Sequence, residues 1–86
     1  MLVHVPSALQ SYTRGEADVQ AAGATLADLL ADLDRRFPGL RFRIIDEQDR
    51  IRPHIKLFID VELADAIGAS VTSAKEVHII TALSGG

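Results

Sequence analysis

A single amphipathic helix is the feature that most limits the folds open to this chain. Between residues 26 and 37 the large apolar side chains recur at offsets of three, four and seven, which places them on one helix face: Leu26, Leu29, Leu30, Leu33 and Phe37. Thr25 is a good N-cap residue before this stripe, and Pro38-Gly39 ends the helix. One helix buries its stripe most economically against one face of a sheet, so the sequence predicts an α+β fold.

Short apolar runs on both sides of the helix predict the strands of that sheet. The expected strands span residues 1–5, 17–22, 55–59 and 75–83. The first two are expected to form a hairpin. The stretches expected to be loops or turns are 7–15, 46–50, 60–62 and 63–73, and residues 40–45 are expected to add a short turn of helix. By alternation, six side chains should face the helix: Val3, Val5, Leu57, Ile59, Val77 and Ile79.

Size and composition exclude several classes of protein. With 86 residues, the chain is expected to form a single domain over residues 1–86. The net charge of -3 argues against a nucleic-acid partner, and the absence of cysteine excludes thiol catalysis and cysteine-bound metal. No apolar run approaches the about 20 residues of a membrane span, and the N-terminus lacks the features of a signal peptide. We therefore expect a cytoplasmic protein that does not bind membranes.

The sequence ends in Gly85-Gly86, directly after the last predicted strand. Glycine has no Cβ and reaches backbone conformations that are closed to other residues. A tail of this kind can thread a narrow channel and present its α-carboxylate to the active site of another protein. We expect a flexible tail whose access depends on Gly85, Ser84 and Leu83.

The chain offers weak candidates for chemistry of its own. His4, His54 and His78 lie on separate predicted strands or strand edges, without i,i+4 spacing or a nearby acidic run, so no metal site is expected. The nucleophile motif Gly-x-Ser-x-Gly is absent. We expect neither a bound cofactor nor catalysis by this chain alone.

The order of elements, together with the terminal Gly-Gly, resembles the ubiquitin-like β-grasp sulfur carriers of the ThiS/MoaD family, with the CysO-like members most similar. The segments that carry the resemblance are Gly23-Ala24-Thr25-Leu26, Leu29-Leu30 with Leu33, Phe37-Pro38-Gly39-Leu40, residues 55–59, residues 76–80 and Ala82-Leu83-Ser84-Gly85-Gly86. Two turns depart from the family pattern. Asp60-Val61 stands where members commonly carry Asn-Gly, and Ser73-Ala74-Lys75 replaces a glycine-containing acidic turn.

The resemblance implies a ubiquitin-like β-grasp with a mixed sheet and one main helix packed on one face. It also implies that a ThiF/MoeB-like enzyme uses ATP to adenylate the Gly86 carboxylate. A sulfur donor then converts the adenylate to a thiocarboxylate, and a biosynthetic enzyme accepts the sulfur for a cofactor, cysteine or another sulfur-containing metabolite. All catalytic groups would belong to these partners.

Three other functions remain open for a chain of this kind. It could be the small subunit of molybdopterin synthase, a ubiquitin-like modifier joined to lysine amines through Gly86, or an interaction module whose Gly-Gly is incidental. For any of these functions, alternation places a docking surface on the sheet face opposite the helix. The expected docking residues are Phe58, His78, Ile80 and Lys56, with Leu2 and His4 beside them.

Overall fold

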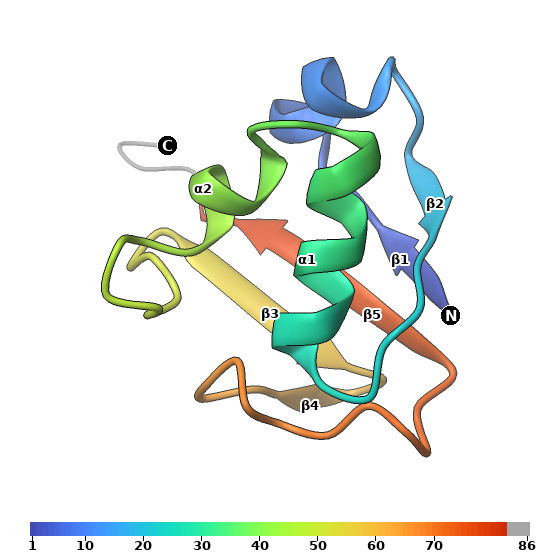
Figure 1. Cartoon of the computed structure of the whole chain (residues 1–86), viewed down its shortest axis with the longest axis vertical. Coiled ribbons are helices and arrows are strands. Elements are labelled where there is room, and N and C mark those ends of the chain that lie inside the picture. The colour runs from blue at the N-terminus through green and yellow to red at the C-terminus, as the bar shows by residue number, and fades with distance from the viewer. Residues whose placement is uncertain (83–86) are drawn as a thin grey trace.

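Five strands form one mixed sheet in the computed structural model, which describes residues 1–82 (Figure 1). The strands are β1 (Leu2–His4), β2 (Asp18–Gln20), β3 (Ile55–Ile59), β4 (Glu62–Leu63) and β5 (Glu76–Thr81). Their order across the sheet is β2-β1-β5-β3-β4. The central pair, β1 and β5, is parallel, and the other neighbours are antiparallel. The predicted α+β class, the first hairpin and the mixed sheet are confirmed.

Helix α1 (Leu26–Arg36) crosses one face of this sheet, in front of the strands in Figure 1. The Thr25 side chain accepts a hydrogen bond from the Asp28 backbone N–H, which satisfies one of the free donors at the helix start. Four leucines on the predicted stripe are at most 3% exposed: Leu26, Leu29, Leu30 and Leu33. They pack against the sheet side chains that alternation assigned to this face. Of those six, only Ile59 is less than fully buried, and it still packs against the core.

Two further helices close the end of the core. The 3-10 helix η1 (Ser7–Thr13) contributes Leu9, and α2 (Leu40–Ile44) contributes Leu40 and Ile44. The short helix expected at residues 40–45 is therefore confirmed. The prediction of a loop at residues 7–15 is wrong for residues 7–13, which form this 3-10 helix and bury Leu9 and Thr13.

The stretch expected to be irregular, residues 63–73, begins with the second residue of a short strand. Strand β4 pairs with β3, with Glu62 opposite Ile59 and Leu63 opposite Phe58. Two residues are too few to show a strand period in sequence, so only the pairing reveals this element. Among residues 1–82, no helix is long and apolar enough to cross a membrane.

Candidate functional site

We call the face of the sheet that points away from α1 the open face. It carries a row of side chains in register across all five strands. Along this row Asp18 of β2 is paired with His4 of β1, and His4 with His78 of β5. His78 is paired in turn with Phe58 of β3, and Phe58 with Leu63 of β4. Side chains directly opposite each other on one face lie close enough to interact. The row therefore forms a continuous surface that is polar at one edge and apolar at the other.

The polar half is a hydrogen-bonded cluster around His4. Its Nδ1 lies 2.7 Å from Asp18 Oδ1, and its Nε2 lies 2.6 Å from Glu76 Oε1. The His4 and His78 rings stack with centroids 4.3 Å apart and an interplanar angle of 15°. His78 Nε2 lies 3.6 Å from the other Glu76 oxygen, Oε2. One carboxylate thus reaches towards both imidazoles.

These contacts shift the proton equilibria of the cluster. The hydrogen bond to Glu76, reinforced by Asp18, raises the pKa of His4 above its ordinary value, although partial burial acts in the opposite direction. The same bond from His4 lowers the pKa of Glu76. Both directions favour an imidazolium between two carboxylates.

The apolar half contains two of the residues expected to dock a partner, Phe58 and Ile80. The structure places Phe58 and Ile80 on the open face, beside Lys56 and His78. Ile80 is 44% exposed and Phe58 is half-buried. Leu63, at 51% exposure, extends this apolar area and was missed because its strand was not recognised. The docking role of these residues remains a prediction.

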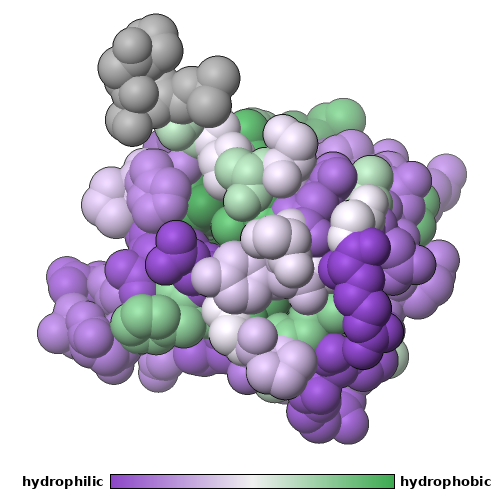
Figure 2. Space-filling model, turned by 90° about the horizontal axis from the view of Figure 1, so that it is seen from above, coloured by the Kyte–Doolittle hydropathy of each residue, from purple (hydrophilic) through white to green (hydrophobic). Residues whose placement is uncertain are grey.

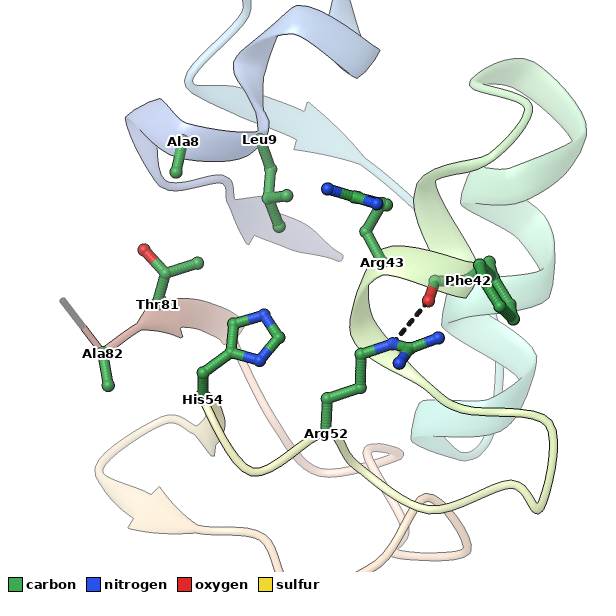
Figure 3. A pocket seen from close by; sticks show the side chains of 8 residues that line it. All are labelled: Ala8, Leu9, Phe42, Arg43, Arg52, His54, Thr81 and Ala82. Carbon is green, nitrogen blue, oxygen red and sulfur yellow. Dashed lines mark hydrogen bonds between the residues drawn. The ribbon is translucent and has the colours of Figure 1, made fainter. Parts of the chain in front are cut away.

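The predicted tail residues Leu83, Ser84, Gly85 and Gly86 lie outside the residues that the structure describes. The last described residue, Ala82, is held next to the start of β3 because its N–H donates to the His54 carbonyl at 2.7 Å. Beside it is a hollow of about 380 Å³ between η1, α2 and the ends of β3 and β5 (Figure 3). It is lined by Ala8, Leu9, Phe42, Arg43, Arg52, His54, Thr81 and Ala82.

Two arginine side chains make this hollow positively charged. Arg43 and Arg52 both line it, and the Arg52 Nε–H donates to the Phe42 carbonyl at 2.7 Å (Figure 3). The Arg52 guanidinium also lies over the Phe42 ring, 4.5 Å from its centroid. The surface at this end of the molecule is largely hydrophilic, with separate hydrophobic patches (Figure 2). Ala82 therefore lies beside a positively charged hollow, although the chain as a whole carries a net charge of -3.

Asp18 and Glu76 are site residues that the sequence reasoning missed. The histidines were compared by their spacing along the chain, whereas strand pairing brings His4 next to His78. Glu76 is two residues before His78, and on a strand this spacing places both side chains on the same face. That signal was present in the sequence. Asp18 could be assigned only once the β1–β2 register was known.

A mixed five-stranded sheet with one helix across one face, and with its last strand leading into a Gly-Gly terminus, defines a ubiquitin-like β-grasp protein. The chain belongs to the ThiS family, whose model matches residues 3–86. The resemblance drawn from the sequence is confirmed.

Individual relatives agree with this assignment. The sulfur carrier protein CysO of Mycobacterium tuberculosis is 26% identical over 98% of this chain and 96% of its own length. A solved complex of BexX and CysO from Amycolatopsis orientalis contains a chain with a TM-score of 0.90 and 27% identity, covering 99% of this chain and 98% of that one. The small archaeal modifier protein 1 of Methanosarcina acetivorans shares the fold, with a TM-score of 0.79 at 19% identity over 99% and 94% of the two chains.

Proposed function

We propose that this protein is a CysO-like sulfur carrier whose Gly86 carboxylate is activated and converted to a thiocarboxylate. The observation that carries the proposal is the family match, which runs through the Gly-Gly terminus to Gly86. The sulfur carrier CysO, a relative that aligns along nearly its whole length, supports the same assignment.

The chemistry assigns the chain the role of a protein cosubstrate. The Gly86 carboxylate attacks the α-phosphorus of ATP in an activating enzyme and displaces pyrophosphate, which gives an acyl-adenylate. Hydrosulfide from a sulfur donor then attacks the acyl carbon, and AMP leaves. The resulting thiocarboxylate transfers its sulfur to the substrate of an accepting enzyme. The adenylating and accepting groups belong to these partners.

The geometry of the described residues is compatible with this role. Strand β5 lies at the centre of the sheet. Directly after β5, the Ala82 N–H donates to the His54 carbonyl, just before β3 begins. The described part of the chain therefore ends at the C-terminal end of β5, directly before Leu83. We infer that the apolar half of the open face docks the activating enzyme while Leu83, Ser84 and Gly85 lead Gly86 to ATP.

The proposal is tested by incubating the purified chain with a ThiF/MoeB-like activating enzyme, ATP and a sulfur donor, followed by intact-protein mass spectrometry. We expect a mass gain equal to the replacement of one oxygen by sulfur. Deletion of Gly86 should abolish the gain while the chain remains folded, because the ends of a chain usually tolerate truncation. A Gly86-deleted chain that still accepts sulfur would contradict the proposal.

Mass spectrometry and size-exclusion chromatography separate the carrier from a modifier and from a synthase subunit. A lysine isopeptide joined to Gly86, without a thiocarboxylate, would instead identify a modifier. A stable stoichiometric complex with a molybdopterin-synthase large subunit on size-exclusion chromatography would identify a synthase subunit. A shuttling carrier must release each partner, so we expect smaller interfaces and no such lasting complex.

A further inference from the structure

We propose that His4, His78 and Glu76 form a binding site for a divalent transition-metal ion, with Zn²⁺ as the expected ion. One ligand atom from each of these residues lies within 4.8 Å of the other two. Two imidazoles and one carboxylate are a donor set that Zn²⁺ accepts. This site does not depend on sulfur transfer, and it lies on the polar half of the open face.

The fold brings the three ligands together without any local sequence motif. His4 and His78 are directly opposite each other on the parallel strands β1 and β5. Glu76 shares the face of His78 because the two residues are two positions apart on β5. The two Glu76 oxygens lie 2.6 Å from His4 Nε2 and 3.6 Å from His78 Nε2. The three groups therefore converge on one point above the sheet.

Asp18 supplies the outer contact that a histidine ligand requires. Its Oδ1 lies 2.7 Å from His4 Nδ1 and can accept the Nδ1–H hydrogen bond. A histidine that binds metal through Nε2 almost always donates its other ring N–H to a carboxylate, a carbonyl or water, which fixes the tautomer and the ring orientation. Once Nε2 has lost its proton, Asp18 therefore keeps the His4 Nε2 lone pair directed at Glu76 and His78.

Metal binding replaces a proton in this cluster. When His4 is an imidazolium, its Nε2–H donates to Glu76; when the ion binds, that proton is released and Nε2 and the carboxylate both become ligands. The two carboxylates of Asp18 and Glu76 balance the charge of a divalent ion. The two histidine side chains are 31% and 34% exposed, so an ion can reach the cluster from solvent. Three protein ligands leave a fourth position for water or for a group from a docked partner.

The test uses the full chain, three matched histidine variants and one aspartate variant. Zn²⁺ is titrated calorimetrically into the wild type and into His4→Gln, His78→Gln, His54→Gln and Asp18→Asn, and Co²⁺ is added as a visible spectroscopic probe. His4→Gln and His78→Gln should each weaken binding by about tenfold or more, and Asp18→Asn by about tenfold. His54→Gln should bind as the wild type does, because His54 lies outside the cluster.

Equal loss in the His54→Gln variant, or no loss in the other two, would overturn the proposal. Because a variant can also fail by unfolding, the second measurement uses the wild type alone. On addition of Zn²⁺, the NMR shifts should centre on the His4 and His78 rings and on Glu76. Shifts centred on the chain ends, or none at all, would equally overturn it.

Discussion

Asp60 and Glu76 are joined by two hydrogen bonds between the end of β3 and the start of β5. The Asp60 N–H donates to the Glu76 carbonyl at 2.9 Å, and the Glu76 N–H donates to Asp60 Oδ1 at 3.1 Å. The same carboxylate oxygen accepts from the Lys75 N–H at 3.0 Å. Asp60 also has a left-handed φ of 54°, which is uncommon outside glycine, asparagine and aspartate. In the two-residue turn that replaces Asn-Gly, Asp60 therefore adopts the left-handed conformation and its carboxylate accepts two backbone hydrogen bonds.

We expect Asp60→Ala to destabilise the fold by about 1–2 kcal/mol, because two backbone donors lose their acceptor and alanine is strained at this φ. Asp60→Asn keeps an acceptor oxygen and tolerates the left-handed region, so it should retain most of the stability. Urea denaturation of both variants measures the difference. Equal stability of the alanine and asparagine variants would contradict the assigned role of Asp60.

Gly23 is required by close packing at the start of α1. A Cβ added there would lie 2.5 Å from the Asp28 Cβ and 2.8 Å from the Leu29 backbone nitrogen. We expect Gly23→Ala to cost about 1–3 kcal/mol, because the loop must move away from the first helical turn. Thermal denaturation provides the measurement. Gly68→Ala is the matched control, since no atom lies within 4 Å of its added Cβ; a loss as large as that of Gly23→Ala would remove the packing explanation.

Asp32 should make stability depend on pH in the acidic range. Its Oδ2 accepts from the Ala22 N–H at 2.9 Å, and this bond, with help from Arg36 and Arg35, lowers the pKa of Asp32. The folded state therefore binds the proton more weakly than the unfolded state does. The stabilisation is fully present above the ordinary aspartate pKa and is lost as the pH falls through the lowered folded pKa.

The measurement is the denaturation midpoint of the wild type and of Asp32→Asn as a function of pH. We expect the acid-dependent decline to be shallower in the asparagine variant, since its side chain cannot be protonated in this range. Asp65→Asn, at an exposed position after β4, serves as the charge-matched control. Parallel curves for the wild type and Asp32→Asn would show that this carboxylate does not contribute.

Phe58 tests the docking surface. We expect Phe58→Ala to raise the Michaelis constant of the activating enzyme for this carrier by about fivefold or more, because buried aromatic residues dominate interface energies. The turnover number should change little, since Phe58 lies on the sheet and not on the tail. Ile80→Ala changes the same surface at a more exposed position, so a rise in the Michaelis constant for this variant could not be attributed to unfolding. Val61→Ala, 90% exposed in the β3–β4 turn, is the control that should leave the kinetics unchanged.

Elements with a strong local period or a strong terminator could be predicted from the amino-acid sequence. The leucine stripe from Leu26 to Leu33, its Thr25 cap and the run from Ile55 to Ile59 could be predicted because each is a local pattern with a local physical cause. The family was also readable, because the ordered segments and the Gly85-Gly86 ending span nearly the whole chain.

Tertiary structure alone decided which side chains from distant segments meet. Strand β4 is two residues long and exists only through its pairing with β3. The parallel register of β1 and β5 places His4 against His78, which is 74 positions later, and brings Glu76 into the same cluster. The antiparallel register of β1 and β2 adds Asp18. Register depends on the packing of the whole core, because a slip by one residue would turn every side chain of a strand to the other face. The contacts among the residues of the polar half therefore could not be predicted from the sequence, because they depend on the strand register.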